Sequence, residues 1–298
     1  MFIGFAPHSF RTHTTQLLFR GKFRSKDFDD VVAEAKVLVA AGAKELNLVA
    51  EDTNQYYLDR RGSGKNLALL LQELSKIEGL HWIRILYAYP SYFSDDLIDE
   101  IATNPKVAKY IDMPLQHISN LTLLAMNRPP QDHTMELLNK LRDRIPGLAL
   151  RTTFISGFPS EREEDHRELV EFVKTFKFER MGAFAYSEEE GTPAAEYEEQ
   201  LDQELREFRR DELISLQQGI GEAWARSMYG KEVDVLVDGM TEDGELFGRT
   251  QWDAPDIDNI VFLSESEDES VPRLEVGQMR RCKVIGRSIF DLEAVPVA

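Results

Sequence analysis

The chain has 298 residues, 42% of them hydrophobic and 30% charged, a composition typical of soluble globular proteins and unlike that of disordered or fibrous ones. Its formal net charge of −18 argues against sequence-independent binding to nucleic-acid phosphates, which depends on Lys and Arg. One cysteine, Cys282, excludes an internal disulfide framework and any multi-cysteine metal site. Because no apolar run approaches the ~18–20 residues of a membrane span, and because the first residues lack a basic region and a cleavage pattern, we expect a cytoplasmic protein without a membrane partner.

From Asp27 to about Phe184, helical and strand patterns alternate. Helices are predicted where apolar residues recur at helical spacing, and strands where short apolar runs end at Pro, Gly or polar residues. The predicted helices cover 27–42, 67–79, 94–105, 118–128, 133–147 and 160–176; the predicted strands with their end loops cover 45–53, 82–90, 109–117, 148–159 and 179–187.

This alternation predicts an α/β fold with a parallel sheet. About five βαβ units in ~160 residues favour a partial (β/α) barrel over a full eight-unit barrel. In that architecture the chemistry lies at the C-terminal ends of the strands. The residues expected around this mouth are Glu51, Asp52, Pro90, Gln116, His117, Gly157 and Tyr186.

The pattern changes after the last of these strands. A turn-rich segment, 191–200, leads to a long charged amphipathic helix that is expected at about 201–228. From Gly230 onward, short alternating strands are separated by Gly, Asp and Asn turns, which predicts a small all-β barrel of ~65 residues. The acidic segment 264–270 is expected to be a solvated hairpin tip.

Six spaced segments together resemble the radical S-adenosylmethionine methylthiotransferases. They are RGKFRSK (20–26), LVAEDTNQYY (48–57), YAYP (87–90), MPLQHISNLTLLAMNRP (113–129), RTTFISGFPSEREED (151–165) and YSEEEGTPAA (186–195). DAPDIDNIVF (253–262) is similar to the branch that modifies an aspartate of a small-subunit ribosomal protein, and the final barrel resembles a TRAM domain. The resemblance implies an atypical N-terminus at 1–19, a radical SAM-like core with its connecting helix at 20–229, and a TRAM-like barrel at 230–298.

The resemblance implies S-adenosylmethionine and [4Fe–4S] clusters as cofactors. In this family a Cys-x3-Cys-x2-Cys loop holds the cluster that cleaves S-adenosylmethionine, and a second cluster in a separate N-terminal domain delivers sulfur. Counted back from residue 20, the three cysteine positions fall at Pro7, Arg11 and Thr14, none of which is a cysteine. His8 and His13 lie nearby, but their spacing does not rebuild a three-ligand loop. We therefore expect this chain to hold no cluster, and we assign it no metal ligand and no catalytic residue.

Two explanations of the missing ligands stay open. Either residues 1–19 are a mistaken or alternative start, joined where the family pattern resumes, or the chain is a pseudoenzyme that lost both clusters. In both cases we expect the chain as written to be inactive in radical chemistry. The first explanation is also compatible with a protein of an organelle. Its targeting signal would then precede the segments that resemble the family.

The resemblance carries over five candidates for binding S-adenosylmethionine. Arg151 is a candidate partner of its carboxylate, Gln116 of its ribose or amino group, and Glu51 of its ammonium or a ribose hydroxyl. Gly157 and Pro159 are expected to let the backbone pass close to the adenine, as glycine allows. The structural alternatives are an ion pair for Arg151, a solvated loop carboxylate for Glu51, and an ordinary strand-to-helix turn for Gly157.

Two neighbouring positions are interpreted structurally. His117 is expected to make a structural hydrogen bond, because radical chemistry needs no histidine base. Ser160 stands where the family usually has glycine. With Glu163 it is expected to form the capping box of the 160–176 helix.

The charge of the final barrel bears on its partner. Residues 231–298 hold 7 Lys and Arg against 16 Asp and Glu, a net formal charge of −9. An RNA-binding module needs a basic face, whereas an acidic surface attracts a basic protein. We therefore expect a basic small-subunit ribosomal protein as partner, with tRNA less favoured, and Asp253, Asp256 and Asp258 as docking charges. Three functions stay open: a protein-aspartate methylthiotransferase, a tRNA methylthiotransferase, and a non-catalytic module that binds a ribosomal protein.

Overall fold

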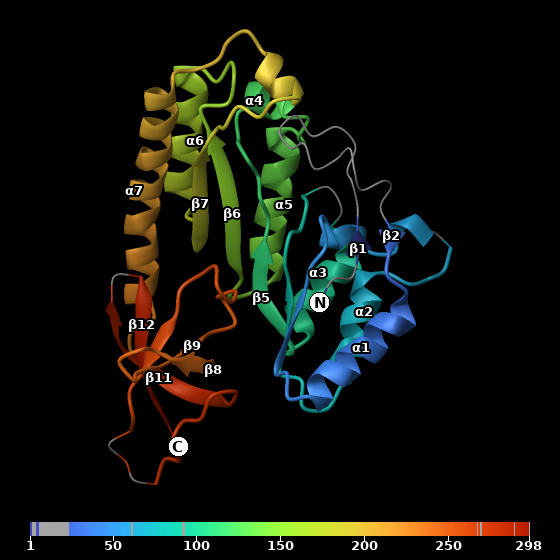
Figure 1. Ribbon diagram of the computed structural model, residues 1–298, viewed down its shortest axis with the longest axis vertical. Coiled ribbons are helices and arrows are strands. Elements are labelled where there is room, and N and C mark those ends of the chain that lie inside the picture. The colour runs from blue at the N-terminus through green and yellow to red at the C-terminus, as the bar shows by residue number, and fades with distance from the viewer. Residues whose placement is uncertain are drawn as a thin grey trace.

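A five-stranded parallel sheet, in the order β3-β4-β5-β6-β7, forms the larger part of the molecule (Figure 1). Its strands are β3 Glu45–Leu48, β4 Trp82–Ile85, β5 Val107–Asp112, β6 Ala149–Ser156 and β7 Arg180–Ala185. The helices are α1 Phe28–Ala40, α2 Leu67–Ser75, α3 Asp95–Thr103, α4 Asn120–Ala125, α5 Gln131–Arg144 and α6 Glu163–Phe176, with short 3-10 helices at Thr53–Gln55, Leu58–Arg60 and Pro193–Glu196. Neighbouring strands follow one another in the sequence, so the sheet is the partial (β/α) barrel that the sequence predicts.

The computed structural model describes residues 1, 4–5, 24–60, 62–90, 93–266, 268, 270–288 and 290–297. Two short strands, β1 Gly4–Phe5 and β2 Arg24–Ser25, pair in antiparallel fashion. The positions discussed above as possible cluster ligands lie outside the described residues, as does most of the predicted N-terminal segment 1–19. These positions are Pro7, His8, Arg11, His13 and Thr14.

The two faces of the sheet differ because successive side chains of a strand point to opposite sides. Ile83 and Phe154 are fully buried and share one hydrophobic cluster with helix residues such as Leu70. Burial of each such side chain contributes roughly 1.5–3 kcal/mol. The opposite, concave face carries charged groups, among them Arg84 and Arg180. The apolar face therefore anchors the helices, and the concave face is left for polar contacts.

A long helix leads from the sheet to a second unit. α7 Gln203–Ser227 has 25 residues, about 37 Å of helix, and packs against α6 and β7 (Figure 1). Beyond it, β8 Glu232–Met240, β9 Leu246–Arg249, β10 Val261–Leu263, β11 Met279–Ser288 and β12 Asp291–Pro296 close into the predicted barrel, in the order β10-β12-β11-β8-β9. None of the described helices has the length and apolar character needed to cross a membrane.

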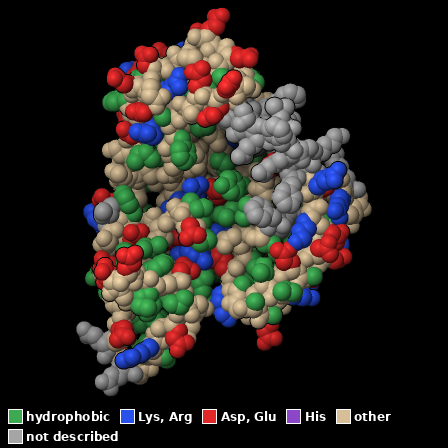
Figure 2. Space-filling view, viewed as in Figure 1, with side chains coloured by type: hydrophobic (Ala, Val, Ile, Leu, Met, Phe, Trp, Pro, Cys, Tyr) green, Lys and Arg blue, Asp and Glu red, His purple; other side chains and the backbone are tan. Residues whose placement is uncertain are grey.

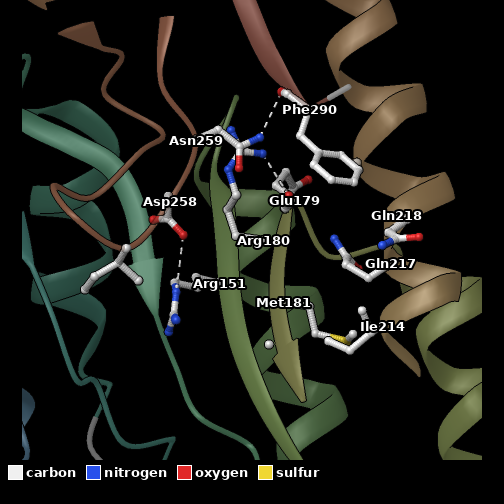
Figure 3. Close-up of a pocket in the computed structure, with 13 residues that line it drawn as sticks. Arg151, Glu179, Arg180, Met181, Ile214, Gln217, Gln218, Asp258, Asn259 and Phe290 are labelled. Atoms are coloured by element: carbon white, nitrogen blue, oxygen red, sulfur yellow. Dashed lines mark hydrogen bonds and ion pairs between the residues drawn. The ribbon is translucent and has the colours of Figure 1, made fainter. Parts of the chain in front are cut away.

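The barrel is joined to the concave face of the sheet by two ion pairs, of which Arg180–Asp253 is buried at both ends and Arg151–Asp258 is partly buried. Arg180 Nε donates to Asp253 Oδ1 at 2.9 Å. Arg151 Nε lies 3.3 Å from Asp258 Oδ1, a pair drawn in Figure 3. Tyr110 OH also donates to Asp258, at 2.7 Å. A further carboxylate on this face, Glu45, pairs with arginines of both β4 and β9. We call the two pairs Arg180–Asp253 and Arg151–Asp258 the interdomain clamp.

The clamp corrects the expectation that the acids of the 253–262 segment are docking charges. Asp253 is 2% exposed, and the Asp258 side chain is 4% exposed. A buried carboxylate needs a partner, and the arginines that serve are far away in the sequence. Only Asp256 of the three is exposed.

The start of α6 also differs from the prediction. Its N-cap is Arg162, and the capping box is closed by Asp165, not by Ser160 and Glu163. Ser160 instead lies in a turn before the helix with φ at 69°. This is the left-handed region that favours glycine, which explains why the family pattern has glycine there.

Candidate functional site

The C-terminal ends of the parallel strands meet at one edge of the sheet, and the loops that follow them are linked to one another. Thr53 N, in the loop after β3, donates to Tyr87 O after β4 at 2.9 Å. Asp52 Oδ1 accepts from Tyr89 N at 3.2 Å, and Asp112 O at the end of β5 accepts from Ala88 N at 2.7 Å. In the view of Figure 2 the molecule is hollowed at its centre, with hydrophobic and charged side chains in the hollow. The predicted mouth therefore exists as a connected set of loops.

Gln116 is the candidate whose side-chain oxygen has no hydrogen-bond partner among the described residues. Its backbone has φ at 72° and joins β6, since Gln116 N donates to Thr153 O at 2.9 Å and Ile155 N donates to Gln116 O at 2.8 Å. The side-chain Oε1 is buried and has no hydrogen-bond partner within the described part of the chain. Ser156 Oγ, at the end of β6, is likewise buried and unpartnered among the described residues. The Gln116 oxygen suits a ligand with ammonium or hydroxyl donors.

Gly157 has packing reasons to be glycine. Its φ is 74°, and a Cβ there would lie 2.5 Å from Arg206 Cγ and 2.9 Å from Arg206 Cα of α7. Its amide donates to Glu161 Oε2 at 2.7 Å, and the amide of Phe158 donates to the same oxygen at 3.2 Å. The loop is thus held by the protein itself, and contact of Gly157 and Pro159 with an adenine stays a prediction.

Glu161 organises this loop, although no sequence pattern singles this residue out. Its side chain is fully buried and accepts from Arg209 of α7 at 2.8 Å. Burial raises the pKa of this carboxyl, but His117, Arg209 and the Gly157 amide outweigh the effect of burial, so that the pKa of Glu161 is lowered.

His117 Nδ1 accepts from Ser119 N at 3.0 Å, the structural hydrogen bond expected for this histidine. Arg209 was missed in the sequence analysis, because the spacing of apolar residues does not reveal which arginine of a charged helix becomes buried.

Arg151 and Glu51 lie in different parts of the sheet. Arg151 precedes the end of β6 by about 16 Å of strand. Its NH1 donates to Asp112 Oδ1 at 2.8 Å, and its Nε pairs with Asp258. The structure thus shows the ion-pair alternative for Arg151, and a contact with a ligand carboxylate stays a prediction. Glu51 is half-buried in the loop after β3, at the mouth.

The donor set does not fit an iron–sulfur cluster. No group of three or more His, Cys, Asp or Glu side chains that could hold a metal occurs among the described residues. The single thiol of the sequence, Cys282, is fully buried in the barrel core, where burial raises its pKa to about 12. Because [4Fe–4S] clusters are held by several thiolates, this chain lacks their ligands.

Comparison with models of known protein families shows which superfamily the chain belongs to. Residues 8–173, more than half of the sequence, match the model of the radical SAM superfamily. The chain belongs to the radical SAM superfamily. Residues 229–297 match the TRAM domain, the second part of this radical SAM protein.

The relatives of this radical SAM protein share one description. It is 43% identical over 274 residues to the ribosomal protein uS12 methylthiotransferase RimO of Clostridioides difficile, covering 92% of this chain and 60% of the relative. It is 42% identical to the RimO of Clostridium botulinum, covering 97% of this chain and 63% of the relative. The chain thus spans about three fifths of the length of these relatives. Among solved structures, the cobalamin-dependent S-adenosylmethionine radical enzyme OxsB aligns with a TM-score of 0.51 and 12% identity, over 74% of this chain and 30% of OxsB, which supports the fold alone.

Proposed function

We propose that the chain binds ribosomal protein uS12 and S-adenosylmethionine as the core and TRAM parts of a uS12 methylthiotransferase. The observation that carries this proposal is the identity of 41% to 43% with proteins described as uS12 methylthiotransferases, over 92% to 97% of the chain. A division near residue 230 belongs to the proposal. It is supported by the start of the TRAM match at 229 and of β8 at Glu232.

The residues at the mouth fit S-adenosylmethionine. Gln116 Oε1, which has no partner among the described residues, suits its ammonium or a ribose hydroxyl, and Glu51 lies at the same edge of the sheet. The loop at Gly157 and Pro159 would form one wall, kept in place by Glu161. When bound, S-adenosylmethionine supplies a sulfonium-activated methyl group. The chain's own residues bind and orient it.

A cluster does not fit the residues present, so we derive no radical step for this chain as written. This mismatch favours a second candidate, a non-catalytic module that binds uS12. The tRNA-modifying alternative is disfavoured by the net charge of −9 on residues 231–298, because phosphate binding requires Lys and Arg.

Binding and iron content test the proposal. We expect S-adenosylmethionine to bind the full chain in calorimetric titration, and Gln116→Ala to weaken that binding, while substitution of the exposed Gln203 to Ala leaves it unchanged. Anaerobic reconstitution should yield no [4Fe–4S] spectrum. About four irons per chain, or a methylthio group on uS12, would refute the expectation that the chain as written holds no cluster and is inactive.

Restoring the missing thiolates is the complementary experiment. The triple variant Pro7→Cys, Arg11→Cys and Thr14→Cys is expected to gain iron on reconstitution. The matched control carries cysteines at Arg11 and Thr14 only, which leaves the set one ligand short. Equal iron in both variants would contradict the ligand positions.

The choice of macromolecule is tested by titrating the full chain with uS12 and with tRNA. We expect uS12 to bind more tightly, and its affinity to fall as salt rises, because exposed charges are screened within about 8 Å at physiological salt. Tighter binding of tRNA would reverse the choice.

A further inference from the structure

The helix α4 turns two apolar side chains to solvent beside the mouth. It follows β5 and Gln116 in the sequence; its residues Thr122 and Leu123 are buried, whereas Leu121 is 45% exposed and Leu124 is 78% exposed. Residues three apart lie on the same side of a helix, so the two leucines form one apolar face, which we call the α4 face. The buried side of α4 packs the helix onto the protein and leaves the α4 face available to a partner.

The segment that follows β7 lies against α4. Tyr197 OH donates to Ala125 O at 3.3 Å, and Ala125 comes directly after Leu124. Ala125 and Tyr197 also pack on one hydrophobic cluster, to which Phe158 and Tyr186 belong. Figure 1 shows the yellow segment beside α4 at one end of the molecule. The α4 face therefore continues into the segment after β7.

This segment is strongly acidic. Residues 187–207 hold nine Asp and Glu against one Arg, a net formal charge of −8. The one arginine, Arg206, is buried, whereas all nine acids are exposed. They are Glu188, Glu189, Glu190, Glu196, Glu198, Glu199, Asp202, Glu204 and Glu207.

Two of these acids are placed closely by the contact with α4. Glu196 and Glu198 flank Tyr197, the residue that donates to α4. Figure 2, in the same view as Figure 1, shows many acidic side chains at this end of the molecule. The apolar α4 face is therefore bordered by negative charge.

The charge selects one kind of occupant for the α4 face. A second copy docked face to face would bring the same acids against one another, and RNA would bring phosphates, so both meet repulsion. A basic protein with apolar side chains can cover the leucines and complement the acids at the same time. Asp253 and Asp258 of the barrel are already paired in the interdomain clamp, so they do not compete for such a partner.

We infer that the α4 face and the acidic segment 187–207 form the surface on which uS12 docks. The identity of the partner rests on the proposed function. α4 follows β5 and the acidic segment follows β7, so a protein docked here lies next to the strand ends, where we place S-adenosylmethionine. The leucines supply the buried contact, and the acids select a basic partner.

The apolar part of the surface is tested by titrating variants of the full chain with purified uS12 and, separately, with S-adenosylmethionine. Leu121→Gln combined with Leu124→Gln removes the α4 face, and glutamine keeps the helix propensity of leucine. The matched control combines Val37→Gln with Leu38→Gln. These two exposed apolar residues belong to α1, which lies far from α4 in Figure 1.

The charged part is tested by Glu196→Gln combined with Glu198→Gln. Its matched control combines Glu242→Gln with Asp243→Asn. This control removes the same two charges from the exposed turn between β8 and β9 of the barrel.

We expect the leucine pair of substitutions to weaken uS12 binding about tenfold, because the partner no longer buries two leucines. The Glu196 and Glu198 pair should weaken uS12 binding about threefold at low salt and make the affinity less dependent on salt. Both controls should bind uS12 like the unsubstituted chain. All four variants should keep the melting temperature and the affinity for S-adenosylmethionine.

Unchanged uS12 binding by the leucine variant overturns this inference alone. An equal loss of S-adenosylmethionine affinity overturns it in favour of a cofactor contact. If the leucine variant melts at a lower temperature, the glutamate variant decides, and equal salt dependence in this variant and its barrel control overturns the inference. Failure of the unsubstituted chain to bind uS12 overturns the proposed function and this inference with it.

Discussion

Ser160 is a single residue whose backbone would suit another amino acid. Its φ of 69° lies in the left-handed region. We expect Ser160→Gly to raise the free energy of unfolding by about 0.5–1 kcal/mol, because relief of this strain exceeds the entropy that glycine adds to the unfolded chain. Urea denaturation measures the change. Ser187→Gly, at an exposed position without a positive φ, should give no gain, and an equal gain there would contradict the explanation.

Asp165 makes the stability of the start of α6 depend on pH. Burial raises its pKa, but Arg162 and the Ser119 hydroxyl outweigh burial and lower the pKa to about 2 from 3.8. A carboxyl with a depressed folded pKa stabilises the protein above its unfolded pKa, and the contribution is lost as pH falls through the folded value. Asp165→Asn should therefore cost about 2 kcal/mol at pH 7 and flatten the fall in stability between about pH 4 and pH 2. Asp143→Asn, at an exposed site, should change stability by less than about 0.5 kcal/mol; a comparable loss there would argue against the cap.

At the level of elements, the linking helix α7 also shapes the mouth. Arg206 fills the space beside Gly157, and Arg209 binds Glu161. Gly157→Ala should lower the free energy of unfolding by about 3 kcal/mol, because the new methyl group meets helix backbone and the φ is positive. Gly191→Ala separates these causes: its φ is 80° but no atom lies within 4 Å of the new Cβ, so only about 1 kcal/mol is expected. Equal losses in denaturant titrations would rule out the helix contact.

The elements themselves were largely predictable, and the reasons why some features were not are physical. Apolar periodicity gives strands and helices, and strand ends then give Glu51 and Gln116 as mouth residues. The same periodicity contains no information on which polar side chains become buried. Glu161 with Arg209, and Asp253 with Arg180, are distant in the sequence, and only the packed fold brings them together.

At the scale of the whole molecule, the interdomain clamp fixes the barrel on the sheet. Asp253→Asn leaves Arg180 buried beside an uncharged group, which should destabilise the protein by about 3–5 kcal/mol. Asp256→Asn, three residues away and exposed, is the matched control and should have little effect. Thermal or denaturant unfolding of both variants measures the difference, and similar stabilities would show that the buried pair contributes nothing.

The clamp also has a consequence for how the molecule comes apart. Separating the barrel from the sheet would remove the ion-pair partners of Arg180, Asp253 and Asp258 at the same time. Because an unpaired charge is costly, neither unit keeps its full stability alone. Calorimetry should therefore record a single endotherm whose van't Hoff and calorimetric enthalpies agree, as in a two-state transition. Two resolved endotherms would mean that the units melt independently. If there is one endotherm, a substitution that destabilises the barrel also unfolds the sheet and its mouth. The two units then resist heat and proteolysis to the same extent.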